Sequence, residues 1–197
     1  MPRDENVVLR DAFPVGGETV TWPEQGDAVE EVHEERPVLL LCGGGAIAQE
    51  VARLAQASGF MVDVVGVAED GVNTERFPMA QHCLTLPDFQ NLVEACQIGR
   101  SHYVAILARE YPLQREALSQ ALSSHAQYIG MAGSRQERDR VYAALRASGM
   151  PDAELAAVCC PMGLNIGAQT PQQIAIAVVA ELLAARAGTL TRLRFDT

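Results

Sequence analysis

The sequence predicts a doubly wound α/β domain, in which helices cover both faces of a mostly parallel sheet. The run at residues 38–42 is continuously apolar rather than alternating, as expected of a strand that is buried on both faces. A glycine cluster follows, and then a helical pattern over residues 49–58 that stops at Gly59. Apolar runs and helical patterns then alternate as far as residue 187, which is typical of a parallel sheet with crossover helices.

The glycine cluster has the spacing of a dinucleotide-type phosphate loop, G-x-G-x-x-A, in Gly43, Gly45 and Ala48. Gly43 permits the tight turn, Gly45 lets the backbone approach a phosphate, and Ala48 lets the helix pack close to the strand. The N-terminus of the helix points unpaired N–H groups at an anion. A plain tight turn between strand and helix is the alternative. The residues predicted to line the loop are Gly43, Gly44, Gly45, Ala46 and Ile47.

Composition indicates one globular domain with a tail: of the 197 residues 48% are apolar and 20% charged, and no run is long enough to span a bilayer. There is no secretion signal, and the five cysteines lack the spacing of a disulfide framework, so we expect a cytoplasmic protein. The net charge of -10 argues against binding to nucleic acid or to acidic membranes.

Residues 1–36 are acidic and show little periodicity, so we predict a poorly packed leader that precedes a domain over residues 37–197. Trp22 is the exception in this leader. We expect it to dock on the core, and contact with a partner is the alternative.

The second predicted strand, residues 61–65, ends where a dinucleotide-binding enzyme carries an acidic residue for the ribose 2′-hydroxyl. Here this position is Gly66. Glu69 and Asp70 lie a few residues later and could substitute, but the simplest interpretation is that the ribose contact is missing. The pattern therefore argues against ordinary NAD binding.

The remaining elements follow from apolar runs, caps and turn residues. Further strands are predicted at residues 82–86, 102–108, 126–131 and 156–159. Further helices are predicted at residues 89–96, 113–123, 135–148 and 174–187, the last opened by a capping box at Thr170 and Gln173 with Pro171 between them. We expect the strand order 3-2-1-4-5-6, closed by the final helix, with a ligand at the switch point beyond the carboxyl ends of the strands.

Two further positions suit an anion. Arg109 follows the fourth strand, at the sheet edge where ligands bind. Gly133, Ser134 and Arg135 form a second strand-to-helix turn, whose N–H groups, hydroxyl and guanidinium could bind an anion. An ordinary capped helix is the alternative, because an arginine in the first helical turn opposes the helix dipole.

The last strand leads into an irregular loop over residues 160–170, and loops of this kind tend to be functional. Cys159 and Cys160 at its start are either structural thiols or contacts to a sulfur- or metal-bearing ligand. Structural zinc is not supported, because no C-x-x-C pair or histidine cluster accompanies them. The histidines also lack partners at the spacing of a hydrolytic triad.

Several segments together resemble the C-terminal Rossmann domain of the XdhC/CoxI family, the accessory proteins of xanthine dehydrogenase and related molybdenum hydroxylases. The matching segments are residues 43–48, 75–78 (Glu-Arg-Phe-Pro), 128–135, 161–168 and 170–175, with Ala180 and Glu181. The resemblance implies a chaperone rather than an enzyme. Such a chaperone holds the molybdenum cofactor, molybdopterin, supports its sulfuration and delivers it to an apo molybdenum hydroxylase, with a cysteine desulfurase as a further partner. The chain departs from the family pattern at residues 66–68, which replace Asp-Asp-Arg, and at residues 108–111, which replace Thr-Arg-Gly-His.

The resemblance also implies roles for site residues. Beyond the first glycine loop, the cofactor-binding residues would be Arg109, Gly133, Ser134, Arg135, Gly163, Asn165 and Gly167. The first four of these would hold phosphate and the last three would lie along the pterin. Cys159 or Cys160 would face the metal or its sulfur.

Two other function classes stay open. An NAD(P)-dependent oxidoreductase is the rival, against which Gly66 and the lack of an evident proton donor both argue. The third hypothesis is an assembly module that binds a nucleotide and contacts a partner protein.

The final helix carries apolar residues on nearly every face, and these cannot all point into one sheet. A homodimer is therefore the expectation, and complete burial of the helix within the monomer is the alternative. The residues concerned are Ile174, Ile176, Val178, Val179, Leu182 and Leu183.

Overall fold

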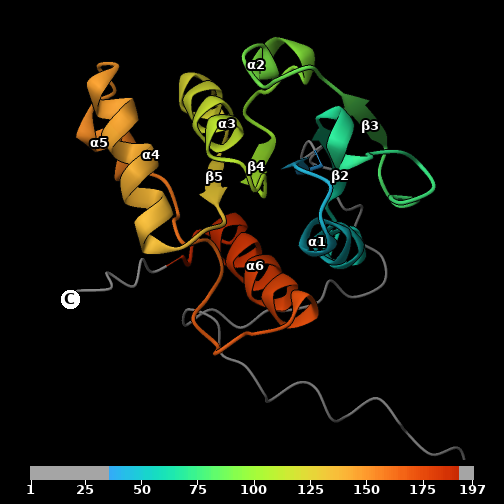
Figure 1. The fold of residues 1–197 in the computed structure, drawn as a ribbon. Helices are drawn as coiled ribbons and strands as arrows, with labels where there is room; N and C mark the ends of the chain where they lie inside the picture. The colour runs from blue at the N-terminus through green and yellow to red at the C-terminus, as the bar shows by residue number, and fades with distance from the viewer. Residues whose placement is uncertain (1–35, 191–197) are drawn as a thin grey trace, which may run out of the picture. The chain divides into compact units, whose positions relative to one another are not determined.

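The computed structural model describes residues 36–190, which contain a five-stranded sheet in the order β3-β2-β1-β4-β5 with every pairing parallel (Figure 1). The strands are β1 (Val38–Cys42), β2 (Met61–Gly66), β3 (His82–Thr85), β4 (His102–Ile106) and β5 (Tyr128–Met131). The helices are α1 (Ala46–Ala57), α2 (Leu92–Ala95), α3 (Tyr111–Ser123), α4 (Arg135–Ala147), α5 (Asp152–Leu155) and α6 (Pro171–Arg186), with a 3-10 helix, η1 (Ala68–Asp70). The predicted doubly wound α/β fold is confirmed. The predicted leader lies, apart from Arg36, outside the described residues, as does Trp22.

Helices α1 and α6 cover one face of the sheet, and α2, α3 and α4 cover the other (Figure 1). Strand β1 contributes alternately to the two cores. Leu39 and Leu41 belong to the core that contains α1 and α6, whereas Leu40 and Cys42 belong to the core that contains α3 and α4. All of these side chains are buried, which explains why the strand is continuously apolar in the sequence.

The predicted sixth strand, residues 156–159, is wrong. Only Cys159 bridges to β5, opposite Gly130, with backbone hydrogen bonds of 2.9 and 3.0 Å. The chain before it coils into α5, a helix that the sequence analysis missed, and Pro161 after it has no N–H to extend a ladder. The outer edge of β5 therefore carries one bridge where the prediction placed a strand.

The predicted helix over residues 89–96 is also shorter than expected, since only α2 is helical. The Asp88 carboxylate accepts a hydrogen bond from the backbone N–H of Gln90 at 2.9 Å, which stabilises a turn in place of the first helical turn. Strand β4 ends at Ile106 instead of Ala108, so the loop that follows it begins two residues earlier than predicted.

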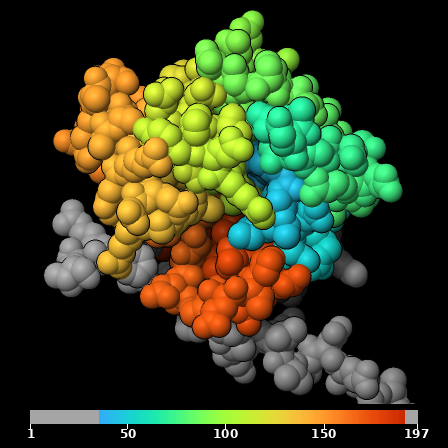
Figure 2. Space-filling model, viewed as in Figure 1, coloured from blue at the N-terminus to red at the C-terminus, as the bar shows by residue number. Residues whose placement is uncertain are grey.

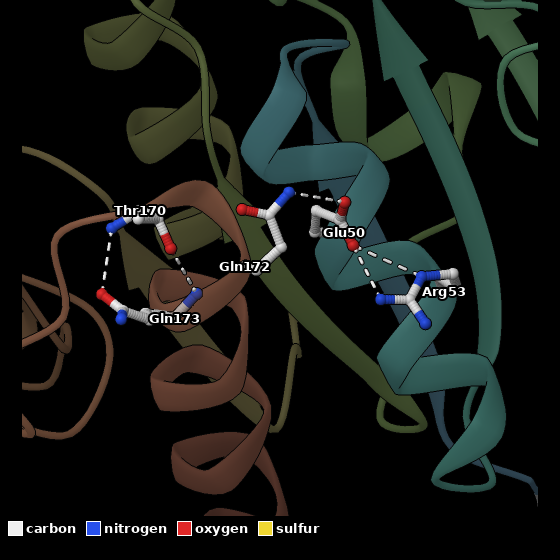
Figure 3. Close-up of polar contacts among 5 residues, drawn as sticks. All are labelled: Glu50, Arg53, Thr170, Gln172 and Gln173. Atoms are coloured by element: carbon white, nitrogen blue, oxygen red, sulfur yellow. Dashed lines mark hydrogen bonds and ion pairs between the residues drawn. The ribbon is translucent and has the colours of Figure 1, made fainter.

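The predicted capping box opens α6 and places its first turn beside α1 (Figure 3). The Thr170 hydroxyl accepts from Gln173 N at 3.3 Å, and the Gln173 side chain accepts from Thr170 N at 3.2 Å. Between them, Gln172 Nε2 donates to Glu50 of α1 at 3.1 Å, and Glu50 pairs with Arg53 at 2.8 Å. The N-terminus of α6 is thus held next to the helix that follows the glycine loop.

The apolar surface of α6 is only partly buried. Val178, Val179 and Leu182 lie in the core, whereas Ile176 is 52% exposed and Leu183 39% exposed. Complete burial within the monomer is therefore wrong for these two side chains, and the homodimer stays a prediction. None of the helices within residues 36–190 has the length and apolar composition needed to cross a membrane.

A buried tyrosine and a buried glutamate join β5 to α6. Tyr128 Oη donates a hydrogen bond to the carboxylate of Glu181, and both side chains are buried. Burial, and after it the charge of Glu181, raise the pKa of Tyr128 well above its usual value, so the phenol keeps its proton as the donor. Gly130 leaves room for the ring, because a Cβ there would lie 2.5 Å from Tyr128 Oη.

We predict that Tyr128→Phe lowers the free energy of unfolding by about 1–3 kcal/mol, because the buried Glu181 carboxylate then loses its donor. Tyr142→Phe is the matched control, since the hydroxyl of Tyr142 has no hydrogen bond among the described residues. Its effect should stay within about 0.5 kcal/mol. Urea denaturation of the three proteins measures both effects, and equal values for the two variants would contradict the prediction.

Candidate functional site

The carboxyl ends of β1 and β4 meet at the switch point, and Gly43 lies there. Gly43 has φ +123°, a conformation that other residues rarely adopt, and its N–H donates to Val65 O at 2.7 Å. A Cβ at this position would lie 2.9 Å from the backbone nitrogen of Ala108, in the loop after β4. The predicted tight turn at Gly43 is confirmed, and the approach of the neighbouring loop is the reason that it must be glycine.

The N-terminus of α1 is open to an anion. Gly45 is the N-cap, with no side-chain hydrogen bond to the first turn and no acidic residue within it. The Arg109 guanidinium lies above Gly45, with Nη2 3.7 Å from where a Cβ would stand. Arg109 is exposed and has no hydrogen bond or ion pair within residues 36–190. Free helix N–H groups beside an unpaired guanidinium are a favourable place for phosphate.

Figure 2 looks onto this part of the surface. In this view the cyan atoms of α1 lie between the yellow-green atoms that begin α3 and the orange-red atoms of α6 (Figure 2).

A buried glutamine fixes the loop that carries Arg109. Gln114 of α3 is buried, and its Nε2 donates to the carbonyl oxygen of Ala108 at 3.0 Å. Losing this bond would leave a buried carbonyl without a partner. The sequence analysis missed Gln114, and its position on the apolar side of a predicted helix was the available signal.

The second turn predicted to bind an anion, Gly133–Arg135, differs from the N-terminus of α1 because side chains already cap it. Ser134 and Glu137 form a capping box: Ser134 N donates to the Glu137 carboxylate at 2.6 Å, and Glu137 N donates to the Ser134 hydroxyl at 3.2 Å. The backbone hydrogen bond from Ser134 holds the pKa of Glu137 below its usual value, so a carboxylate occupies this helix N-terminus. The alternative of an ordinary capped helix therefore accounts for Gly133–Arg135, and a phosphate there would meet a negative charge.

Arg76 ties the glycine loop to the turn after β2. Its Nη1 donates to the carbonyl oxygens of Asp70 and, at 3.0 Å, of Gly71, while its Nη2 donates to the carbonyl of Gly44 at 2.6 Å. The amide oxygen of Gln49, oriented toward the guanidinium, accepts from Nε at 3.1 Å and from Nη2 at 2.6 Å. Arg76 belongs to the Glu-Arg-Phe-Pro segment at residues 75–78, for which the sequence predicted no role. The structure shows that it is the link between two loops at the switch point.

The turn after β2 packs directly on two glycines. A Cβ at Gly66 would lie 2.8 Å from the Asp70 carboxylate oxygen Oδ2, and a Cβ at Gly44 would lie 2.6 Å from the carbonyl oxygen of Asp70. Asp70 Oδ2 also accepts from Val67 N at 3.1 Å. The carboxylate of Asp70, one of the two acidic residues that could substitute at this position, therefore lies over Gly66, while the missing ribose contact stays a prediction.

Cys159 and Cys160 point toward different cores and do not form a common site. Cys159 packs against the core that contains α1 and α6, and Cys160 against the core that contains α3 and α4. Burial raises the pKa of the Cys160 thiol to about 12, so it is protonated at neutral pH and is a weak ligand and nucleophile. Across the described part of the chain, no group of three His, Cys, Asp or Glu side chains could hold a metal ion.

The loop predicted to lie along a pterin packs against α6 at its start. Gly163 lies against Ala177 and Val178, and Leu164 N donates to the carbonyl oxygen of Ala177 at 3.1 Å. Beyond this contact Asn165 and Gly167 are exposed. Helix α6 thus anchors the start of the loop, and the exposed part can contact a ligand.

A family described as the XdhC Rossmann domain matches residues 39–182 of this chain. The chain is 34% identical over 152 residues to an uncharacterized protein, YqeB, of Escherichia coli (strain K12), over 77% of this chain and 28% of that protein. It is 29% identical over 153 residues to a protein of Bacillus subtilis (strain 168) described as a probable xanthine dehydrogenase component, over 78% of this chain and 44% of that protein.

Among solved structures, a xanthine dehydrogenase from Bacillus halodurans superposes with a TM-score of 0.67 at 24% identity, over 82% of this chain and 45% of that chain. This similarity shows the same fold. The chain spans less than half the length of each of these relatives.

We predict that Arg76→Lys lowers the free energy of unfolding by about 2 kcal/mol, because one ammonium cannot bridge the separate carbonyls that the planar guanidinium reaches. Amide exchange at Gly44 and Gly71 should accelerate, and urea denaturation together with hydrogen exchange measures both effects. Arg53→Lys is the control, since its pair with Glu50 is exposed to solvent and a lysine can keep the ion pair. Equal losses in the two variants would count against the bridging role.

We also predict that alanine is tolerated differently at two neighbouring glycines. Gly44→Ala should cost about 1–3 kcal/mol, because its Cβ would meet the backbone of Asp70. Gly45→Ala should cost less than about 1 kcal/mol, because the nearest atom is 3.7 Å away. Chemical denaturation of both variants tests this, and a costly Gly45→Ala would show that the loop has no open space at its N-cap.

Proposed function

The chain belongs to the family of XdhC Rossmann domains, and from this membership we propose that it binds a molybdenum–pterin cofactor and transfers it to a xanthine dehydrogenase-type enzyme. The observation that carries the proposal is the uncapped N-terminus of α1, which lies beside the Arg109 guanidinium at the switch point, and Arg109 has no ion pair with any residue of the described range 36–190. Molybdopterin ends in a phosphate, and this arrangement suits a phosphate.

Different parts of the site would hold the phosphate end and the pterin end of the cofactor. Backbone N–H groups after Gly45 and the Arg109 guanidinium would hold the phosphate, and the exposed loop at Asn165 and Gly167 would lie along the pterin. The cofactor supplies the redox chemistry of its metal, and this chain would supply only binding and orientation. Cys159 and Cys160 point toward different cores, so only one of them could face the metal or its sulfur, and that single contact remains part of the proposal.

The partner in this proposal is an apo molybdenum hydroxylase. The names of the relatives from the two Bacillus species support it, because both refer to xanthine dehydrogenase. A cysteine desulfurase that sulfurates the bound cofactor belongs to the same proposal, and we assign no residue to its contact. In this scheme the chain itself carries out no turnover.

Mass spectrometry of small molecules released from the purified protein tests the proposal. We expect a pterin from protein produced in cells that make molybdenum enzymes. Recovery of NAD and no pterin would overturn the proposal in favour of a nicotinamide-dependent enzyme.

We predict that Arg109→Gln lowers the affinity for a molybdopterin preparation about tenfold, the value of one lost hydrogen bond to a charged group. Arg100→Gln is the control, because it changes the net charge equally but lies at the amino end of β4, on the opposite edge of the sheet. Calorimetric titration of both variants measures the difference. An unchanged affinity in Arg109→Gln, or an equal loss in the two variants, would remove Arg109 from the site.

A further inference from the structure

The outer face of α6 and the loop before it carry almost no charge. From Pro161 to Ala185 the only ionisable side chain is Glu181, which is buried and accepts a hydrogen bond from Tyr128. The whole chain, in contrast, is 20% charged and has a net charge of -10. Two copies of a chain with this charge repel each other, and the repulsion is smallest where the facing surfaces are uncharged. This face is therefore suited to contact between two copies.

Large apolar side chains are exposed on the same uncharged segment. Within residues 36–190 the large apolar side chains that stay exposed are Ile166, at 54%, together with Ile176 and Leu183 of α6. A single exposed isoleucine on a surface is ordinary, but a group of them on one uncharged segment is typical of a protein–protein interface.

The loop that carries Ile166 is tied to α6 at both ends. Leu164 N donates to the carbonyl oxygen of Ala177 at 3.1 Å, and Gln169 N donates to the side chain of Gln173 at 2.9 Å. The loop therefore follows the first turns of the helix, and its exposed isoleucine extends the apolar surface at that end of α6.

The exposed side chains of α6 form a stripe that can pair with a copy of itself. Ile176, Ala180 and Leu183 have the spacing i, i+4, i+7 and so lie on one side of the helix. The two large side chains lie at the ends of the stripe, and the half-buried Ala180 lies close to its middle. In an antiparallel pair, each isoleucine would meet the leucine of the other copy, and the helices would approach most closely at the alanine. Such self-complementarity is what contact across a two-fold axis requires.

We infer that α6 packs antiparallel against α6 of a second copy of this chain, with the two-fold axis at Ala180. The dimer predicted from the sequence thereby gains a face, an orientation and a register. None of these depends on the proposed function.

Sedimentation velocity of the full chain tests the face and the orientation. We expect a dimer at micromolar concentration. Ile176→Lys and Leu183→Glu should each weaken it about a hundredfold, because each substitution occurs twice in the interface and places a charge against an apolar side chain. The double variant should restore the dimer, since antiparallel packing sets each new lysine beside a new glutamate of the other copy.

Ala143→Lys is the matched control for the lysine variant. Ala143 is exposed on α4, which covers the other face of the sheet, so the change in net charge is the same and the dimer should persist. Because the substituted positions are exposed, every variant should keep its fold, and the melting temperature of each variant reports on this.

Cysteine cross-linking tests the register. Ala180→Cys should form a disulfide-linked dimer under mild oxidation, because the two copies of this residue face each other on the axis. Ile176→Cys should not, since about seven residues of helix, or roughly 10 Å, separate the two copies of residue 176 in antiparallel packing. The wild type, with its five cysteines, is oxidised in parallel as the control.

Three outcomes would overturn the inference. Cross-linking through Ile176→Cys would show that the helices pack in another register or in parallel. A dimer that survives both charged single variants would use another face of the molecule. A wild type that stays monomeric at micromolar concentration would leave the α6 face to a different partner. None of these outcomes bears on pterin binding, so the proposed function is tested separately.

Discussion

The Arg76 guanidinium is the contact on which the ligand edge of this sheet depends. It bridges the carbonyl of Gly44, in the loop between β1 and α1, to the turn after β2, and Arg76 itself lies 32 residues from that glycine in the sequence. These segments approach so closely that Gly44 and Gly66 have no room for a side chain. Because the open N-cap at Gly45 directly follows Gly44, the shape of the candidate phosphate site depends on the same contact.

Charge distinguishes the helix N-termini that otherwise look alike in the sequence. Ser134 opens α4 with a capping box whose third residue is Glu137, so that N-terminus already holds a carboxylate. Thr170 opens α6 with a neutral box that uses Gln173. Only α1 combines a glycine N-cap without a side-chain cap and a nearby arginine without a partner in residues 36–190. The physical requirement for an anion site, donors that are free and not opposed by negative charge, is therefore met best at α1.

The sequence predicted what depends on local pattern and missed what depends on distant contacts. Strand β1 is found at the predicted residues because burial on both faces leaves a continuous apolar run. The role of Arg76 was not predictable, since its partners lie in other loops and no periodicity marks them. Strand prediction failed at residues 156–159 for a related reason: their apolar composition suits a strand, but Pro161 and α5 leave only a bridge.

The relation between Gly66 and Asp70 shows why spacing rules are insufficient at this edge. A strand end can carry its carboxylate directly, or it can be glycine and accept a carboxylate from the following turn, but sterically it cannot do both. In the second arrangement the strand position must stay without a Cβ, and the turn must be held down, here by Arg76. The signal to look for in a sequence is then not an acidic residue at the strand end. It is a glycine there, an acidic residue about one helical turn later, and an arginine beyond it that can reach the glycine loop.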